Sequence, residues 1–155
     1  MALAFHDDRR PDLEAIRILY AAAPLRRPIG DPARIARMFD GSNVIYSAWA
    51  GDRLVGLLRG WTDGAFDGYV CDLAVHPRYQ KAGVGKGLLA MLLPRHPDVR
   101  WVLLAAPLAK GYYGRVGWER LDNAWVLPRP NGAMPSYEAF QAEFADLAAQ
   151  AWQEA

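Results

Sequence analysis

The sequence has a single cysteine, Cys71, among its 155 residues. One cysteine excludes an intrachain disulfide and any zinc site that is built on several thiolates. The longest apolar runs, 88–93 and 101–109, are far shorter than the roughly 18 residues that a membrane-spanning helix needs. The amino terminus reaches Asp7 and Asp8 before it can form the apolar stretch of a signal peptide. We therefore expect a protein of the reducing cytoplasm, without a membrane partner.

Net charge is also nearly absent, since the chain carries only +1 at pH 7. The charges are unevenly spread: residues 78–120 hold eight Lys or Arg against two acids, whereas residues 136–155 hold four acids and no base. A nucleic-acid-binding domain is usually basic as a whole, so we expect no nucleic-acid partner. A compact basic stretch suits a small polyanion such as a phosphorylated cofactor, with solvated surface charge as the alternative.

The composition is that of a folded protein, because 52% of the residues are hydrophobic and six are tryptophan. A chain of this length fills one domain and can bury a core. We expect a single domain over 1–155 that ends in an amphipathic helix at about 136–153. The apolar face of this helix would pack on its own sheet or on a second subunit, which would make a homodimer. That face comprises Tyr137, Phe140, Phe144, Leu147 and Trp152.

Apolar periodicity predicts a chain in which helices and strands alternate. Helical spacing predicts further helices over 11–20, 32–39 and 88–93, the last closed by Pro94 and Pro97, and a helical segment with paired tyrosines at 110–117. β-rich runs predict strands at 3–5, 43–50, 53–61, 67–75, 101–105 and 118–127, of which 101–105 reads as covered on both faces. This order indicates the mixed α/β (α+β) class.

The most informative stretch is a glycine-rich turn between a strand and a helix. Glycines at 83, 85 and 87 lie where the helix begins, and the unpaired N–H groups and dipole of a helix start favour an anion. Glycine also lets the backbone approach a ligand closely. Residues 80–86 are therefore predicted to hold a phosphate or pyrophosphate, with an ordinary tight turn as the alternative.

Two familiar nucleotide-binding motifs do not fit this turn. A Walker loop needs Gly-Lys-Ser/Thr, but Gly85-Lys86 is followed by Gly87, which offers no hydroxyl for magnesium. A Rossmann turn needs Gly-x-Gly-x-x-Gly and an acid about 20 residues later. This chain has Gly-x-Gly-x-Gly instead, and the residues at the later position, 103–107, are Leu-Leu-Ala-Ala-Pro and include no acid.

Two motifs resemble those of the GNAT superfamily of acetyl-CoA-dependent N-acetyltransferases. The family pattern Arg/Gln-x-x-Gly-x-Gly/Ala matches Gln80-Lys-Ala-Gly83-Val-Gly85, which follows a strand that ends Leu73-Ala-Val75-His-Pro. The family pattern aromatic-Tyr-x-x-x-Gly-aromatic matches Tyr112-Tyr113-Gly-Arg-Val-Gly117-Trp118. The resemblance covers nearly the whole chain. It implies a central mixed, mostly antiparallel, splayed β-sheet flanked by helices, with acetyl-CoA as co-substrate and no metal.

The resemblance also implies which residues bind the co-substrate. The main chain around Leu73, Ala74 and Val75 would pair with the pantetheine arm, and the N–H groups of the glycine-rich turn would hold the pyrophosphate. Lys81 and Lys86 would add charge there, or would simply be solvated. The residues of the turn are Gln80, Lys81, Ala82, Gly83, Val84, Gly85 and Lys86.

Attack of an amine on a thioester needs a donor for the oxyanion and a proton for the departing thiolate. The resemblance assigns the thiolate acid to Tyr113, whose alternative is packing between helix and sheet, and the oxyanion donor to the N–H of Leu73. Strand alternation puts Asp72 on one face with Val70 and Ala74, where it would accept a proton directly or through water, or make a structural hydrogen bond.

Other polar residues fit the site less well. Asp63 and Asp67 would attract a cationic amine or belong to a solvated turn. His76 is expected in a turn, and Cys71 as a small buried side chain. Many family members have an Asn where this chain has Ala106, so the pantetheine pocket differs in detail.

The sequence thus predicts an acyltransferase that transfers acetyl from acetyl-CoA to a primary amine, of a small molecule or a peptide, by direct attack in a ternary complex. One alternative is a catalytically silent acyl-CoA-binding regulatory module, and another is a structural dimerisation domain. The acceptor stays open between an aromatic amine, a polyamine, an aminoglycoside and a peptide terminus. The residues expected near it are Leu25, Arg26, Arg27, Trp61, Phe66 and Trp125.

Overall fold

The computed structural model describes residues 2–109 and 111–153, so Lys110 of the predicted 110–117 segment lies outside the described residues. The strands are β1 (Leu3–His6), β2 (Val44–Ala50), β3 (Arg53–Thr62), β4 (Asp67–Val75) and β5 (Arg100–Leu103). The α-helices are α1 (Leu13–Ala22), α2 (Pro32–Asp40), α3 (Val84–Ala90), α4 (Leu92–Arg95), α5 (Tyr112–Arg115), α6 (Tyr137–Glu143) and α7 (Ala145–Ala149). Short 3-10 turns are η1 (Pro77–Tyr79), η2 (Pro107–Ala109) and η3 (Gln150–Trp152).

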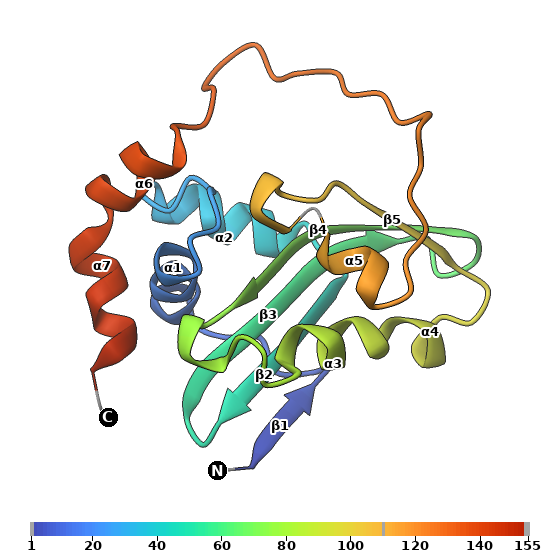
Figure 1. The fold of residues 1–155 in the computed structure, drawn as a ribbon, viewed down its shortest axis with the longest axis horizontal. Coiled ribbons are helices and arrows are strands. Elements are labelled where there is room, and N and C mark those ends of the chain that lie inside the picture. Colours follow the sequence, from blue (N-terminus) through green and yellow to red (C-terminus); the bar gives the residue numbers. More distant parts are fainter. Residues whose placement is uncertain (1, 110, 154–155) are drawn as a thin grey trace.

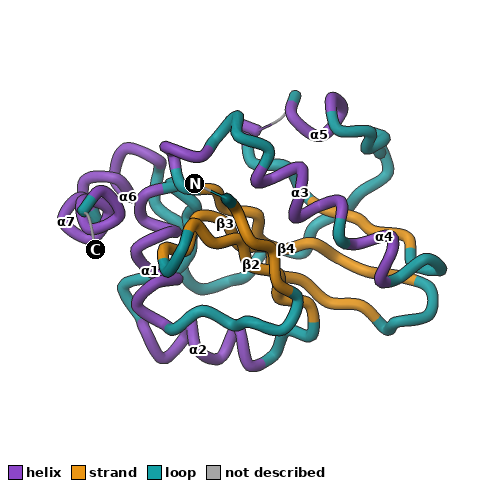
Figure 2. The backbone as a smooth tube through the Cα atoms, turned by 90° about the horizontal axis from the view of Figure 1, so that it is seen from below, coloured by secondary structure: helices purple, strands orange, loops and turns teal. Residues whose placement is uncertain are grey.

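The five strands form one sheet in the order β1-β2-β3-β4-β5. Neighbours from β1 to β4 are antiparallel, and β5 runs parallel to β4. The helices α1 and α2 cover one face and α3, α4 and α5 the other (Figures 1 and 2). This arrangement confirms the predicted fold class, a mixed and mostly antiparallel sheet flanked by helices.

Local sequence signals explain where the first helices begin. The carboxylate of Asp12 accepts a hydrogen bond from Ala15 N at 2.8 Å, and that of Asp31 accepts one from Arg34 N at 3.1 Å. Both are side-chain caps, and Pro32 after Asp31 suits the first helical position. At the other end of the domain, Pro94 lies inside α4 instead of closing the preceding helix.

The carboxyl-terminal helical segment packs against α1 of the same chain. Phe140 is completely buried in a core cluster with Ile16 and Leu19 of α1, and Phe144 and Leu147 pack against this cluster. Most of the predicted apolar face is therefore covered within the chain, by α1 and by sheet residues such as Leu57 and Ala74, whereas Trp152 stays 44% exposed. The homodimer stays a prediction.

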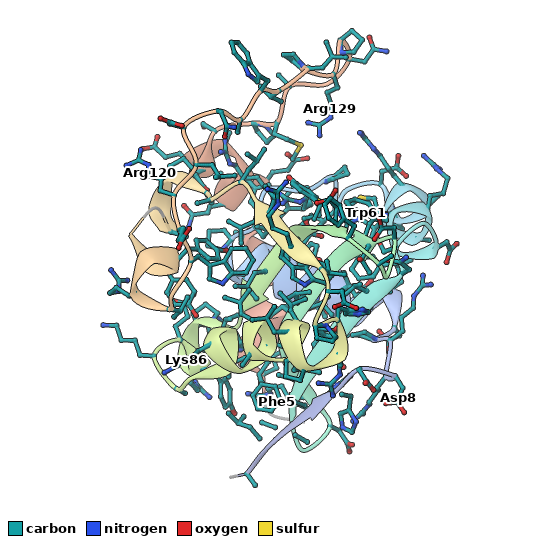
Figure 3. All side chains as sticks on the ribbon, turned by 90° about the vertical axis from the view of Figure 1, so that its right-hand side faces the viewer. Phe5, Asp8, Trp61, Lys86, Arg120 and Arg129 are labelled. Atoms are coloured by element: carbon teal, nitrogen blue, oxygen red, sulfur yellow. The ribbon has the colours of Figure 1, made fainter. Side chains whose placement is uncertain are left out.

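Two of the sequence predictions for the late strands are wrong. Residues 118–127 form no strand but the start of a long loop, which arcs away from the body between α5 and α6 (Figures 1 and 3). Trp125 is 96% exposed in this loop. Its β-favouring residues have no neighbouring strand to pair with, and Asp122 and Asn123 disfavour a strand. Because this segment does not cover β5, β5 is only half-buried and is not enclosed on both faces as predicted.

A β-bulge at Cys71 interrupts the ladder between β3 and β4. Arg59 pairs with Asp72 and Gly60 pairs with Val70, so Cys71 is the extra residue of β4. The bulge reverses the alternation of side chains: Val70 joins the core cluster under α3, whereas Asp72 bonds to Tyr20 of α1 on the other face. The expectation that Val70 and Asp72 share one face is therefore wrong.

The strands β4 and β5 separate directly before this bulge. Their pairing runs from Asp67 opposite Arg100 to Val70 opposite Leu103, and β4 continues to Val75 without β5 beside it. We call the region between residues 71–75 of β4 and the chain beyond Leu103 the splay. It is the feature of the sheet that the family resemblance implied.

The carboxylate of Asp72 connects three separate parts of the fold. One oxygen accepts a hydrogen bond from Arg27 Nε at 2.6 Å, and the other accepts from Arg59 Nε at 2.6 Å and from the Tyr20 hydroxyl at 2.7 Å. Asp72 is completely buried and Arg59 nearly so. Burial alone would raise the pKa of Asp72, but the two guanidinium groups and the Tyr20 hydrogen bond hold it below its ordinary value of 3.8.

We expect Asp72→Asn to lower the free energy of unfolding by about 3–5 kcal/mol, because it leaves two arginines around a buried site without an opposite charge. Since the pKa of Asp72 is lower in the folded chain than in the unfolded chain, its contribution is complete well above pH 3.8 and is lost progressively as the pH falls below 3.8 toward the lower folded pKa. Urea unfolding at pH 7 measures the first effect, and a series from pH 5 down to about pH 2.5 measures the second.

The exposed Asp98 provides the matched control, since Asp98→Asn should change the free energy of unfolding by less than about 0.5 kcal/mol. An Asp72→Asn protein as stable as the wild type at pH 7 would contradict this account of the core.

Candidate active site

The edge of β4 that faces the splay consists of main-chain groups. His76 N donates to Val55 O of β3 at 2.8 Å, and successive N–H groups of a strand point to opposite sides. The main-chain groups of Val75 and Leu73 therefore point away from β3 and into the splay. In agreement, Val75 O accepts a hydrogen bond from the side chain of Gln80 at 3.3 Å. An extended ligand could pair with this edge as an added strand does.

The glycine-rich turn lies at the end of this edge and begins α3. Gly83 is the N-cap residue with a φ of 85°, and no side chain caps the helix. A Cβ added at Gly83 would meet nothing within 4 Å, so the turn is open on that side. The first N–H groups of α3, those of Val84, Gly85 and Lys86, have no acceptor within the helix. The arrangement suits an anion.

The other predicted residues of the turn surround this helix start. Gln80, Lys81, Ala82 and Lys86 are exposed, whereas Val84 and Gly85 are buried. Lys81 has a φ of 66°, which helps the chain to turn. Figure 3 shows Lys86 at one end of α3 and Phe5 alongside that helix, where Phe5 packs on Gly87.

The short helix α5 brings two tyrosines to the same side of the sheet. The hydroxyl of Tyr112 lies 2.8 Å from where a Cβ on Gly85 would be, so the missing side chain of Gly85 gives Tyr112 its place over the helix start. The rings of Tyr112 and Tyr113 are 5.3 Å apart, edge to face. The proximity of Tyr112 to Gly85 brings the two sequence motifs together, although these residues are 27 positions apart in the sequence.

Tyr113 packs against the cluster that also contacts Leu73 and Val75. Its ring meets that of Trp118, with 6.0 Å between the centroids. Burial raises the pKa of Tyr113 to about 12, so the phenol keeps its proton at any physiological pH. The side chain is thus a neutral proton donor.

The other two acidic candidates are Asp63, in the turn between β3 and β4, and Asp67, the first residue of β4. Asp63 accepts hydrogen bonds from the backbone N–H groups of Ala65 and Phe66, both at 2.8 Å, and these bonds lower the pKa of Asp63. Asp67 lies 3.7 Å from Arg100, in an exposed ion pair. These contacts favour the structural reading of both residues.

His76 is a buried turn residue, as the sequence predicts. Its Nε2 bonds to Ala151 O at 2.8 Å, and its Nδ1 accepts from Arg78 N at 3.1 Å. Burial lowers the pKa of His76, which keeps the ring neutral in this pairing. The turn that leads to the α3 start is thereby fixed to the last helical segment.

Sequence reasoning missed the role of Arg59 and the pairing of Arg27 with Asp72. A signal for Arg59 was present, because an arginine inside the apolar strand 53–61 needs a buried partner of opposite charge. The partner itself could not be identified, since it depends on the register of two strands.

Within residues 2–109 and 111–153, no three His, Cys, Asp or Glu side chains are grouped so that they could hold a metal ion. No helix in the same ranges is long and apolar enough to cross a membrane.

Comparison with known proteins gives consistent matches. The sequence profile described as "Acetyltransferase (GNAT) domain" matches residues 25–126. A ycf52-like N-acetyltransferase of Prochlorococcus marinus is 32% identical over 113 residues, which are 68% of this chain and 61% of that protein. A ycf52 N-acetyltransferase of Gracilaria tenuistipitata is 28% identical over 61% of this chain and 54% of its own length. This chain thus spans only 54–61% of the length of these curated relatives.

Solved structures agree with the sequence matches. A GNAT-family acetyltransferase of Streptococcus pneumoniae superimposes with a TM-score of 0.70 at 27% identity, over 84% of this chain and all of the other. An aminoglycoside acetyltransferase from a soil metagenome, solved with sisomicin, gives a TM-score of 0.60 over 82% of this chain and 97% of the other. Its identity of 18% shows a shared fold alone. With the profile covering most of the chain and the splay and helix start in place, this protein belongs to the GNAT acetyltransferase family.

Proposed function

We propose that this chain is a cytoplasmic N-acetyltransferase, which transfers the acetyl group of acetyl-CoA to a primary amine by direct attack in a ternary complex. The observation that carries this proposal is the uncovered main-chain edge of β4, which leads directly to the uncapped start of α3. An extended arm that ends in a pyrophosphate matches both features, because it offers amides to a strand edge and negative charge to a helix start.

The residues present suit acetyl-CoA as the co-substrate. Val75 and Leu73 would hold the pantetheine arm through their main-chain groups, and the N–H groups of the turn 80–86 would hold the pyrophosphate. Gly83 supports this assignment, since the space where its Cβ would lie is empty. The side-chain amide of Gln80 would release Val75 O as the arm binds.

The reaction forms a bond between the amine nitrogen and the acetyl carbon and breaks the carbon–sulfur bond. We assign stabilisation of the developing oxyanion to the N–H of Leu73, and protonation of the leaving thiolate to Tyr113. The amine must arrive neutral or lose its proton to water. Asp72 is not suited to accept that proton, because both of its oxygens are already hydrogen-bonded and its pKa is low.

The second candidate is a catalytically silent acyl-CoA-binding module. It is favoured by Asp72, because the residue expected to accept the proton of the amine has both oxygens hydrogen-bonded within the fold. An amine panel with acetyl-CoA separates the two functions, since the enzyme releases free thiol in proportion to the amine. Calorimetric binding of acetyl-CoA without thiol release from any amine would favour the silent module.

We expect Gly85→Glu to abolish acetyl-CoA binding, because its side chain would displace the Tyr112 hydroxyl from the helix start and would repel the pyrophosphate there. Isothermal titration calorimetry measures the affinity. Ala142→Glu, which adds the same charge on the exposed side of α6, should bind like the wild type. A folded Gly85→Glu protein with unchanged affinity would exclude the helix start as the pyrophosphate site.

We expect Tyr113→Phe to lower kcat by about 100-fold, within the range that general acids contribute, with acetyl-CoA affinity unchanged within a few-fold. The ring stays, so packing is kept. Tyr46→Phe is the control, since the buried Tyr46 hydroxyl has no hydrogen-bond partner among the described residues. Steady-state thiol release at saturating amine is the measurement, and near-wild-type turnover of Tyr113→Phe would remove this residue from the mechanism.

A further inference from the structure

The group formed by Asp72, Arg27 and Arg59 has an excess of positive charge. One carboxylate is shared by two guanidinium groups, and neither arginine has a second carboxylate within ion-pair distance in the described part of the chain. Arg59 is buried, and its guanidinium makes cation–π contacts with Phe39 and Trp61, at 5.6 and 5.1 Å from the ring centroids. Arg27 differs, because 27% of its side chain is exposed.

The guanidinium of Arg27 lies at the splay. Its Nη2 donates to the carbonyl of Cys71, the extra residue of the bulge, at 2.8 Å. Cys71 precedes Leu73 by two residues, a distance of about 6.6 Å along a strand. The proposed oxyanion donor and this cation therefore lie along the same part of β4, and one small molecule can reach both.

The orientation of Arg27 is fixed before any ligand binds. Nε is held by Asp72 at 2.6 Å, Nη1 by Arg26 O at 2.8 Å and Nη2 by Cys71 O at 2.8 Å. A guanidinium has five N–H donors, so one on each terminal nitrogen has no acceptor among the described residues. Two N–H donors on neighbouring nitrogens of a planar group suit the two oxygens of a carboxylate.

From this geometry we propose that Arg27 is an anchor for a carboxylate, and that the acceptor is a primary amine that carries a carboxylate. The inference rests on the proposed function and names the substrate class of the same site. The occupant would supply the negative charge that the Asp72 group lacks. Asp72 acts as a positioning residue, since its carboxylate accepts the hydrogen bond from Nε that fixes the orientation of Arg27.

A stacked pair of aromatic rings belongs to the same side of the sheet. Trp61 and Tyr69 lie 6.0 Å apart with an angle of 22° between their planes. Tyr69 is two residues from Cys71, and the ring of Trp61 lies 5.1 Å from the guanidinium of Arg59. An aromatic amino acid is therefore a sensible first probe.

The first experiment compares amines that differ only in the carboxylate. L-phenylalanine is paired with 2-phenylethylamine, and 4-aminobutyrate with propylamine, all with saturating acetyl-CoA. In the wild type we expect kcat/KM for at least one carboxylate-bearing member to exceed that of its partner by about 10- to 100-fold, the range that a charge-assisted hydrogen bond gives. Equal rates within both pairs would overturn the inference while leaving acetyl transfer intact.

The second experiment changes Arg27. Arg27→Lys keeps the positive charge beside Asp72 but loses the planar pair of donors, so it should fold and reduce the carboxylate preference by about 10-fold, chiefly through KM. Arg34→Lys, on the exposed side of α2, should keep the preference. Thermal unfolding of all three proteins checks that the fold is kept. A preference that survives in Arg27→Lys would refute the anchor.

A binding readout makes the inference independent of turnover. N-acetyl-L-phenylalanine retains the carboxylate, and N-acetyl-2-phenylethylamine lacks it. Calorimetry with CoA present should detect only the first, and Arg27→Lys should weaken it by about 10-fold. If no amine releases thiol, the proposed function fails, and this measurement still decides on the carboxylate site. Equal binding of both compounds would exclude the site.

Discussion

The site depends on one shared carboxylate. Asp72 joins the loop after α1, through Arg27, to β3, through Arg59, and to α1 itself, through Tyr20. Because it is buried, its charge must be balanced locally, and both arginines are fixed as a result. The same contacts hold the bulge of β4 against β3. The shape of the strand edge that lines the splay therefore follows from an ion pair on the opposite face of the sheet.

The two faces of the sheet differ in chemical character around this edge. On the face of α3 and α5, the helix start and the tyrosines surround the space assigned to the co-substrate, and their contacts are mostly apolar or main-chain. On the face of α1 and α2, charged side chains lie beside the bulge. The bulge at Cys71 makes this division possible, because it turns Asp72 to the face opposite Val70.

Much of the fold was predictable because its signals are local. The helical spacing over 11–20 and 32–39 and the β-rich runs 43–50, 53–61 and 67–75 correspond to observed elements. The motif residues around Gly83 and Tyr113 are brought to one side of the sheet, although the sequence separates them. The bulge was not predictable, since an extra residue is defined only by the partner strand. The prediction of a strand at 118–127 was wrong for a related reason. A strand needs a neighbouring strand to pair with, and the β propensity of a segment does not show whether one is present.

The uncovered edge of β4 has a consequence for how this chain can diverge. Donors and acceptors of the main chain are present whatever side chains stand at Leu73 and Val75, so these positions are constrained only by the volume beneath α3 and α5. Drift among apolar residues there would leave the edge intact. A change at Arg27 or Asp72 instead adds or removes a whole charge. Over evolutionary time, one face of the sheet would change gradually, while the other would change in discrete steps, each a candidate change of acceptor.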